Sequence, residues 1–579
     1  MRDNHNKGSL VNFSHLLLSK IVGYLTDNID KICFSLVCKR WFDDRDKYLA
    51  FNIDSLKLQH NNKYPEFFLN SYKDLLLRSL STKNNCDLYI SNDILNAINY
   101  DYILNKNNIK DIQTLPRNIN TLLVRGTGDE HHADLSRLLL YSNVVHIYGC
   151  WGLPLGGFPI GIKTIVFNKF NQRLTPGFFP EGIRKINLGY NFNQPLEAGH
   201  LPSTLKYLGL GDLFDHAIAP GTLPSGLEHL YFGFVYNQPF EAGSLPDSLR
   251  ILRLSSKFNQ PLGRDVLPPL LNDLEICRNF KSSLHSLPAS LEKLKFHNFS
   301  NLWIPKIQSL SNLKYLMLIG EDTFELNPGD LPENIESLSL HKCTIHGSAI
   351  PKSVKSLNIS FTEYLYEEIF PVGVNFHFEE LVIGNVKLDK HSLDNVKINQ
   401  LCLDHYFHDL EEGSIPHGIE TVSLGHNINL AIPPGVLPNS VKQLVLADTY
   451  EADSLKRGSI PPSVENLSLK SYFANMTTIE DGVISDSVKT LSLDCTLSGF
   501  KSIPNTIVNI NLTSINYDYR VLCKIRKLDD NYYLIFGRPE QFGLVSGIFH
   551  KSHFLDRFFN SLPKYDLFSF TNNLFNSLS

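Results

Sequence analysis

The side chains best suited to chemistry cluster in residues 126–132, Gly-Thr-Gly-Asp-Glu-His-His, where two carboxylates stand beside two histidines. Carboxylates and imidazoles are common zinc ligands and common general acids and bases. Neighbouring residues on a strand point to opposite faces, however, and the chain has no HExxH spacing to align two histidines on a helix. We therefore interpret the segment as a polar loop. A hydrolase using residues 129–132 is the remaining enzymatic alternative.

Other signatures of catalysis are incomplete. Gly209-Leu210-Gly211 lacks the third glycine and the helix of a dinucleotide-binding loop. Cys33 and Cys38 lie five residues apart, and such cysteines more often fill a core than react. The chain has neither a Gly-x-Ser-x-Gly elbow nor a P-loop. The sequence therefore predicts that the protein is not an enzyme and uses no cofactor and no metal.

Length and composition point to an elongated or multi-domain protein. The chain has 579 residues, whereas a single core stops growing near roughly 250–300 residues. A net charge of −5 gives no general attraction to nucleic acid or to anionic membranes, and no run of about 18 apolar residues could span a bilayer. The nine cysteines include no CxxC pair, and the N-terminus lacks the apolar core of a signal peptide. We expect an intracellular protein, cytoplasmic or nuclear or both, with no nucleic-acid or membrane partner.

The elements that would position any site repeat with a fixed period. An aromatic residue returns every 22 positions, at Phe170, Phe192, Phe214, Tyr236, Phe258 and Phe280. A second phrase, Leu-Pro-x-x-Leu-x-x-Leu-x-Leu, begins with conservative changes at residues 115, 158, 179, 201, 223, 245, 267, 287, 331, 350, 415, 437, 460 and 503. A period of this length is typical of solenoids, in which each repeat is stable only when stacked on its neighbours.

The second phrase indicates how each repeat folds. Its final Leu-x-Leu alternates with period 2, as in a short strand with one buried face. Because each strand returns in the same sense one repeat later, the strands must be parallel. Stacking then turns the aromatic column into a buried spine. The residue after it, usually asparagine, can bond the backbone of the crossing loop. We therefore interpret both columns as structural.

Phe192-Asn193-Gln194-Pro195-Leu196, followed by the Leu-Pro phrase at Leu201, resembles the FNIP repeat, a relative of the leucine-rich repeats. The resemblance covers residues 110 to 513, and the full motif is clearest between 170 and 262. It implies a parallel β solenoid of the leucine-rich-repeat type with irregular crossovers.

Residues 10 to 50 have a different pattern, with apolar residues at helical spacing and a second apolar segment ending near Trp41. This pattern resembles an F-box. That family opens with Leu-Pro-x-Glu-Leu-Leu-x-x-Ile-x-x-x-Leu and closes with Val-Cys-Lys-x-Trp, matched here by residues 13–25 and by Val-Cys-Lys-Arg-Trp at 37–41. Two positions depart from it, because Phe13-Ser14 replaces Leu-Pro and Leu16 replaces the acidic residue.

An F-box docks on the Skp-family adaptor of a cullin-based ubiquitin ligase, and the following repeats hold the substrate. Carried over by this resemblance, the adaptor-binding anchors are Phe13, Leu17, Leu18, Ile21, Leu25, Leu36, Val37 and Trp41. The alternative is a helical cap on a free-standing repeat scaffold that has no role in ubiquitin ligation.

Strand residues between the buried leucines should form an exposed concave face. Most positions in its central column are small or neutral. Tyr231, Arg253, Glu275 and Lys295 are its one run of large side chains, flanked by His229, Asp273, Lys293 and His297. Tyrosine and arginine are over-represented at binding hot spots. We expect these four residues to be either a solvated face or part of the site for a protein substrate.

These patterns divide the chain into four parts. Residues 1–50 form the F-box-like module, 51–110 a linker and N-terminal cap, 111–513 the solenoid, and 514–579 a C-terminal cap and tail. Helical stretches are predicted near Tyr72–Leu80 and Asp93–Ile98. Capping strands are predicted at Tyr519–Leu528 and Tyr532–Gly537, and a terminal helix or frayed end at Phe549–Phe570.

Overall fold

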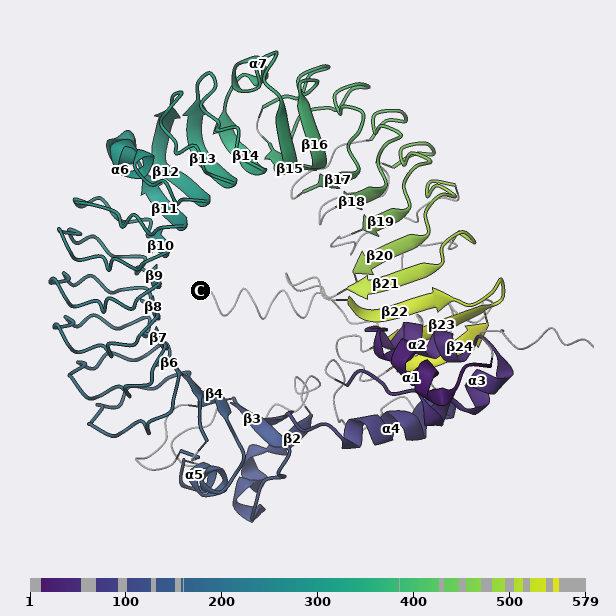
Figure 1. Ribbon diagram of the computed structural model, residues 1–579, viewed down its shortest axis with the longest axis horizontal. Helices are drawn as coiled ribbons and strands as arrows, with labels where there is room; N and C mark the ends of the chain where they lie inside the picture. Colours follow the sequence, from purple (N-terminus) through teal and green to yellow (C-terminus); the bar gives the residue numbers. More distant parts are fainter. Residues whose placement is uncertain are drawn as a thin grey trace, which may run out of the picture. The chain divides into compact units, whose positions relative to one another are not determined.

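The computed structural model describes residues 12–53, 69–91, 101–125, 132–150, 158–159, 161–384, 386–425, 432–446, 455–469, 482–494, 504–513, 521–537 and 545–550 (Figure 1). The chain forms two compact units. One contains residues 84–408, and the other contains residues 1–83 together with residues 409–579.

The unit of residues 84–408 is a parallel sheet with one strand per repeat. β1 (Cys86–Ser91) pairs with both β2 (Tyr102–Asn105) and β3 (Ile119–Val124), and from β3 onwards each strand pairs in parallel with the next. The later strands are β4 (His146–Cys150), β5 (Thr164–Phe167), β6 (Lys185–Asn187), β7 (Tyr207–Gly209), β8 (His229–Tyr231), β9 (Ile251–Arg253), β10 (Asp273–Ile276), β11 (Lys293–Phe299), β12 (Tyr315–Leu326), β13 (Ser337–Ile345), β14 (Ser356–Glu363), β15 (Phe376–Ile383) and β16 (Val396–Leu403). These pairings confirm the predicted parallel solenoid.

The crossovers of this unit contain short helices. These are η5 (Lys106–Asp111), α5 (His132–Leu140), η7 (Asn301–Trp303), α6 (Ile304–Gln308) and α7 (Tyr366–Ile369). β1 and β2 lie within the range in which we expected a linker and cap, and no Leu-Pro precedes either strand. The parallel sheet therefore begins before residue 111. The predicted helix at Asp93–Ile98 falls outside the residues that the structure describes.

The aromatic column forms a stacked spine inside this unit. Phe170 and Phe192 stack with ring centroids 5.7 Å apart and planes within 3°. The following pairs continue at 6.0, 5.9, 6.3 and 6.2 Å as far as Phe280, and all six rings are fully buried. Because each ring touches the next, one repeat's core is completed by its neighbours.

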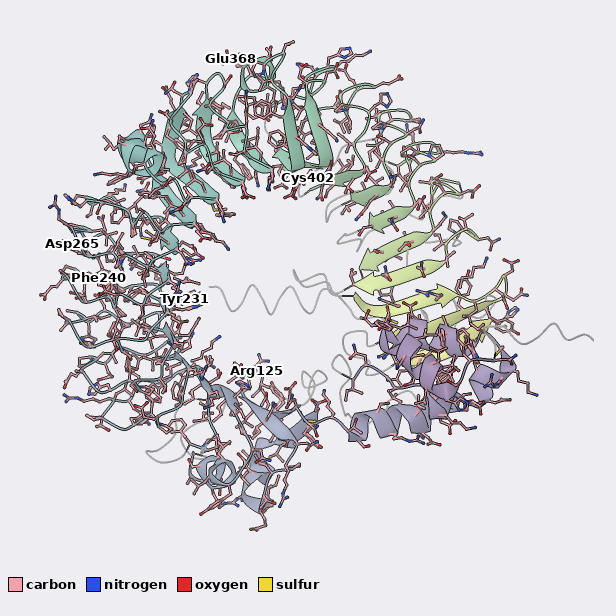
Figure 2. All side chains as sticks on the ribbon, in the orientation of Figure 1. Arg125, Tyr231, Phe240, Asp265, Glu368 and Cys402 are labelled. Atoms are coloured by element: carbon pink, nitrogen blue, oxygen red, sulfur yellow. The ribbon has the colours of Figure 1, made fainter. Side chains whose placement is uncertain are left out.

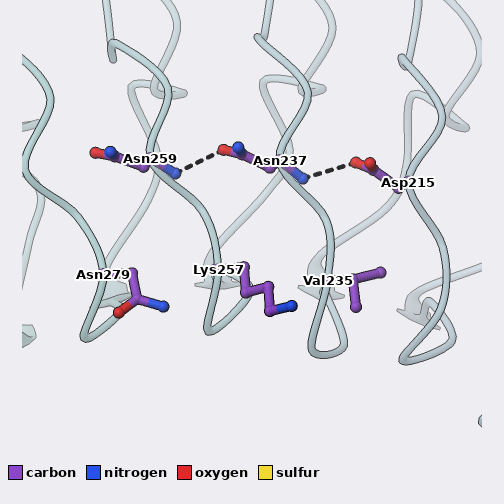
Figure 3. A pocket seen from close by; sticks show the side chains of 6 residues that line it. All are labelled: Asp215, Val235, Asn237, Lys257, Asn259 and Asn279. Carbon is purple, nitrogen blue, oxygen red and sulfur yellow. Dashed lines mark hydrogen bonds between the residues drawn. The ribbon is translucent and has the colours of Figure 1, made fainter.

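The residue after each ring forms a ladder of hydrogen bonds along the solenoid. Asn171 Oδ1 accepts from the backbone N–H of Asn193 at 2.9 Å. Asp215 accepts from the N–H of Asn237, and Asn237 from that of Asn259, both at 2.8 Å (Figure 3). The asparagine was expected to bond a crossing loop. The structure shows that the loop belongs to the next repeat, so the ladder fixes the spacing between repeats.

Glycine and proline set the turns that return the chain to each strand. Gly199, Gly221 and Gly243 have φ of 86°, 81° and 84°, and each lies two residues before a Leu-Pro pair. A residue with a Cβ would be strained in this left-handed conformation. The carbonyl of Pro202 then accepts from the N–H of Leu205 at 3.1 Å, which closes the turn ahead of β7.

The unit of residues 1–83 and 409–579 combines the last repeats with the N-terminal helices. β17 (Thr421–Leu424), β18 (Gln443–Leu446), β19 (Asn466–Leu469), β20 (Thr490–Asp494) and β21 (Asn509–Thr513) pair in parallel. β22 (Val521–Lys527), β23 (Tyr532–Gly537) and β24 (Val545–His550) then continue the sheet antiparallel. β22 and β23 are the strands expected beyond residue 513, whereas β24 was not foreseen as a strand. Residues beyond 550 lie outside the described ranges.

The helices of this unit are α1 (His15–Gly23), α2 (Asn28–Ser35), α3 (Lys39–Asp43), η2 (Arg45–Lys47), η4 (Asn70–Tyr72) and α4 (Lys73–Ser81). α1 begins after Ser14, whose side chain accepts from the N–H of Leu17 and so caps the helix. α4 agrees with the predicted helix near Tyr72–Leu80. The helices share one apolar core with Leu534 and Phe536 of β23, so the N-terminal module packs on the C-terminal strands.

Candidate functional site

The four residues predicted on the exposed face lie side by side on adjacent strands. The strand register places Tyr231 opposite Arg253, Arg253 opposite Glu275, and Glu275 opposite Lys295. Directly paired residues share one face of a sheet. We call this strand face, which alternates with the buried leucines, the inner face. Figure 2 shows Tyr231 on the strand side of the unit and Asp265 on the crossover side.

Arg253 is the centre of an ion-pair network on the inner face. Its two Nη atoms donate to the two carboxylate oxygens of Asp273, both at 2.8 Å, and its Nε lies 3.0 Å from Glu275 Oε2. Two parallel bonds from one guanidinium to one carboxylate fix its orientation as well as its charge. Only 20% of the Arg253 side chain is exposed, so the network is partly shielded from water.

Glu275 also interacts with Lys295 and His297 on the next strand. His297 Nε2 lies 3.0 Å from Glu275 Oε1, and Lys295 Nζ lies 3.7 Å from Glu275 Oε2. The hydrogen bond from His297, together with the charges of Lys295 and Arg253, lowers the pKa of Glu275, although partial burial opposes this shift. The carboxylate therefore stays ionised and holds three neighbouring strands together.

Tyr231 belongs to a separate aromatic group. Its ring stacks on Tyr207 with centroids 4.8 Å apart, and Lys185 Nζ lies 4.4 Å from the centroid of the Tyr207 ring. Tyr207 and Lys185 are not among the residues singled out from the sequence, because flanking residues are considered there only on the strands that carry the four central side chains. They occupy the neighbouring inner-face column, two residues earlier on β7 and β6, and the same 22-residue spacing would have found them.

The structure separates the predicted adaptor-binding residues by exposure. Leu18 and Trp41 are buried in the module's core, where the Trp41 ring stacks on Phe34 at 4.5 Å. Phe13 and Leu36 pack against that core, and Ile21 and Leu25 are half-buried. Leu17 and Val37 are 41% and 65% exposed. Leu18 and Trp41 are therefore core residues and not surface anchors, because their apolar side chains close the module on itself.

Other exposed apolar side chains of the module were not among the predicted anchors. Leu16 is 81% exposed, and Tyr24, at the C-terminal end of α1, is 87% exposed. Leu16 stands where the family pattern has an acidic residue, so the F-box resemblance does not identify it as an apolar contact residue. Large apolar groups with this exposure are candidates for contact with another protein.

The helical module is held on β22 and β23 by charges as well as by apolar packing. Asp27 pairs with Lys524, and Asp30 pairs with Arg526. The Phe51 ring stacks on Phe536 at 5.7 Å. These contacts join residues almost 500 positions apart, such as the 497 between Asp27 and Lys524, so no local pattern could indicate them.

The covered strand face continues the column of inner-face residues on β17–β21. That column is Ser423, Val445, Ser468, Ser492 and Asn511, and the register continues it to Lys524, Phe536 and Ser546. Ser546 Oγ accepts from the N–H of Leu69 at 2.8 Å. The N-terminal module therefore sits on the inner-face side of the three antiparallel strands.

The glycine and cysteine segments with incomplete catalytic signatures have structural roles where the structure describes them. Residues 126–131 lie outside the described ranges, and His132 begins α5. A Cβ at Gly211 would lie 2.2 Å from the carbonyl oxygen of Gly189, so this glycine permits close stacking. Cys33 and Cys38 pack against the core of the module.

Within the ranges that the structure describes, no three histidine, cysteine or carboxylate groups are gathered closely enough to hold a metal ion. Among the helices there, none combines the length and apolar composition needed to cross a bilayer.

Residues 170–213, 214–257, 258–299 and 406–449 match the family model of the FNIP repeat. No curated protein matches the chain. One similar solved structure is described as that of CroV588, a novel circular leucine-rich-repeat protein. It shares 19% identity over 72% of this chain and 73% of that one, with a TM-score of 0.44. The plant peptide hormone receptor RGFR1, solved with RGF2, shares 14% identity over 76% of this chain and 79% of that one, with a TM-score of 0.20. The chain thus contains FNIP repeats.

Proposed function

We propose that this FNIP-repeat chain is a non-catalytic interaction scaffold that binds a protein partner on the inner face of β8–β11. The observation that carries the proposal is the contiguous group formed by Tyr231, Arg253, Glu275 and Lys295 on four successive strands. A solenoid presents such a face as one extended surface, and solenoids commonly bind other macromolecules in this way.

We further propose that the scaffold is the substrate-recognition subunit of a cullin-based, SCF-type ubiquitin ligase. The support is the sequence resemblance of residues 13–25 and 37–41 to an F-box, together with exposed apolar residues on and near α1. In this role the N-terminal helices bind a Skp-family adaptor and, through it, the cullin, while the inner face binds the substrate. A role in a cullin-based ubiquitin ligase would place the protein inside the cell.

Binding of purified Skp-family adaptor tests the ubiquitin-ligase role. The informative variant is Leu17→Glu with Val37→Glu, because both side chains are exposed and their change leaves the core intact. Leu18 and Trp41 are unsuitable, since their loss would unfold the module. Leu270→Glu, at an exposed apolar residue in the other unit, is the matched control.

We expect the adaptor to bind the wild type and the Leu270→Glu control and to be lost from the double variant, with unchanged circular dichroism. Failure of the wild type to bind, or undiminished binding of the double variant, would remove the assignment.

A free-standing scaffold is the second candidate. It is favoured by the packing of the helices on β23, where Leu534 and Phe536 complete the core of the module. In that case the helices cover the end of the sheet, as the ends of a solenoid require. A protein that captures partners through the inner face but never binds the adaptor would have this function.

Affinity capture from cell extract tests the inner face itself. Tyr231, Arg253, Glu275 and Lys295 are replaced together by alanine, and the captured proteins are compared with those of the wild type. We expect at least one reproducible partner to be lost. An unchanged set of partners would remove the face from consideration.

A further inference from the structure

We infer that the inner face of β6–β11 binds an acidic, extended peptide segment of the partner. This inference rests on the proposed function, because it presumes that this face is a binding surface. It adds the chemical class of the ligand, and it follows from the charges left unpaired on the face, their spacing, and a related contact elsewhere in the chain.

The charges on the face are unevenly matched. Across β6–β11 the inner-face positions include Lys185, Arg253, Lys293 and Lys295, but only two carboxylates, Asp273 and Glu275. The chain as a whole carries a net charge of −5, so this local excess of positive charge runs against the average. Complementary charge steers partners to a surface and selects among them.

Both carboxylates on the face are already engaged. Arg253 occupies both oxygens of Asp273, and Glu275 is shared among Arg253, Lys295 and His297. A basic ligand would have to displace these bonds.

The two outer lysines have no such partner. Lys185 contacts the Tyr207 ring, and neither Lys185 nor Lys293 has a carboxylate partner among the described residues. Lys293 is also exposed. The positive charge available to a ligand therefore lies at these two lysines, and it calls for an acidic group at each.

The spacing of the two lysines sets the length of the ligand. Lys185 on β6 and Lys293 on β11 share one column, which runs through Tyr207, His229, Ile251 and Asp273. Adjacent strands lie about 4.8 Å apart, so five steps span roughly 24 Å. An extended peptide advances about 3.3 Å per residue, so roughly seven residues would reach from one lysine to the other.

The chain contains one example of acidic side chains bound on such a face. Asp27 and Asp30, at the start of α2, pair with Lys524 and Arg526 on β22. These two basic residues lie on the inner-face side of the sheet, opposite Asn511 and Asn509. An acidic segment from a distant part of the sequence therefore already uses the chemistry that we infer for β6–β11.

A peptide fits this face better than a nucleic acid. Asp273 and Glu275 lie between the two outer lysines and would repel a continuous phosphate backbone. The Tyr207 ring is contacted by Lys185 from β6 and by Tyr231 from β8, so neither of its faces is open for a stacked base. A peptide can place carboxylates at the lysines and neutral residues between them.

The test measures binding of a fluorescein-labelled peptide of about eight residues, with glutamates at its two ends and serines between them, to the full-length protein. This length covers the span between the lysines. Fluorescence anisotropy compares the wild type with Lys185→Glu/Lys293→Glu and with the milder Lys185→Gln/Lys293→Gln. Lys352→Glu/Lys390→Glu makes the same change in net charge at two exposed lysines away from the inner face.

We expect the peptide to bind the wild type and the control alike, and to bind the face variants roughly tenfold or more weakly. Equal loss in the control, or no loss in the face variants, would overturn the inference. An oligouridylate of equal length that binds more tightly through the same lysines would also overturn it.

Failure of the inference can be separated from failure of the proposed function. If the peptide does not bind, but replacing Tyr231, Arg253, Glu275 and Lys295 still abolishes capture of a partner, the face binds a ligand of different chemistry. The inference is then wrong and the proposed function stands.

Discussion

Two groups of strands, one in each compact unit, bind their inner-face arginines in different ways. On β9–β11, Arg253 takes both carboxylate partners from the next strand, one repeat further along the chain. On β22, Arg526 takes Asn509 from the preceding strand and Asp30 from α2, which is 496 residues away. The first region keeps an open face, whereas the second is covered by the N-terminal module.

The difference shows how a repeat protein can use one surface position for two purposes. Within the repeats, charges on neighbouring strands neutralise each other and leave aromatic and basic groups beside them. Beyond the last repeat, the corresponding strand face of β23 carries two apolar residues, Leu534 and Phe536. These residues pack against the N-terminal helices of the same chain. We therefore expect substitutions on the covered face to affect folding and substitutions on the open face to affect binding.

The largest effect should come from Phe536→Ala on the covered face. The Phe536 ring stacks on Phe51 and is almost fully buried, and removing such a side chain from a core costs about 3–5 kcal/mol. Hydrogen exchange of the α1 and α2 amides should accelerate sharply, while exchange in β6–β12 should not change.

Ile548→Ala is the control for this experiment. Ile548 lies on the next strand, opposite Leu534, and is 43% exposed. Its loss should leave exchange in the helices nearly unchanged. Equal protection of α1 and α2 in Phe536→Ala and wild type would show that the helices do not depend on β23.

A smaller effect of opposite sign is expected beneath the open face, from Tyr236→Phe. Tyr236 is the one tyrosine in the spine, and its buried hydroxyl has no hydrogen-bond partner among the described residues. Removing an unsatisfied buried hydroxyl should stabilise the repeats by about 1 kcal/mol. Hydrogen exchange of the β8 and β9 amides at increasing urea concentration measures this gain in the free energy of unfolding. Phe258→Tyr is the reverse control and should destabilise.

Reversing the charges between α2 and β22 should have an effect of about 1 kcal/mol, the upper range for partly exposed ion pairs. Asp30→Arg alone places two cations together and should weaken attachment of the module. Combining it with Arg526→Asp should restore attachment in part. Limited proteolysis between the helices and the first repeat provides the measurement. If the double variant is cleaved as fast as the single one, the Asp30–Arg526 pair does not contribute to attachment of the module.

The contacts of the open face could be predicted from the sequence, whereas those of the covered face could not. The spine, the ladder from Asn171 to Asn259 and the parallel strands were predictable because each contact joins residues about one repeat apart. The group around Arg253 followed from the same period. The packing of the module on β22 and β23 was not predictable, since the Asp27–Lys524 pair joins residues 497 positions apart and neither residue belongs to a repeating pattern.

Burial within the module was equally hidden from the sequence. A resemblance identifies apolar positions but not which side of a helix meets a distant strand. Leu17 and Leu18 are adjacent and chemically identical, yet Leu18 is 1% exposed and Leu17 is 41% exposed. Only the packing of the helices against one another and against β23 distinguishes the two.

The smallest expected effect concerns the pH dependence of the open face. The hydrogen bond from His297 and the Lys295 and Arg253 charges lower the pKa of Glu275 below its value in the unfolded chain. Such a group contributes stability above the unfolded pKa of about 4.3 and loses it as the pH falls through the folded pKa. The contribution should therefore be complete at neutral pH and disappear in acid.

Glu275→Gln measures that contribution by difference. At neutral pH the variant should show faster hydrogen exchange in β10 and β11 than the wild type, by an amount corresponding to about 0.5–1 kcal/mol. As the pH falls through the lowered pKa of Glu275 the two proteins should converge, because the wild-type carboxyl becomes protonated and neutral. Glu333→Gln, at an exposed position outside the strands, should match the wild type throughout. A difference between Glu275→Gln and wild type that persists in acid would mean that Glu275 acts through packing, and the open face would then resemble the covered one.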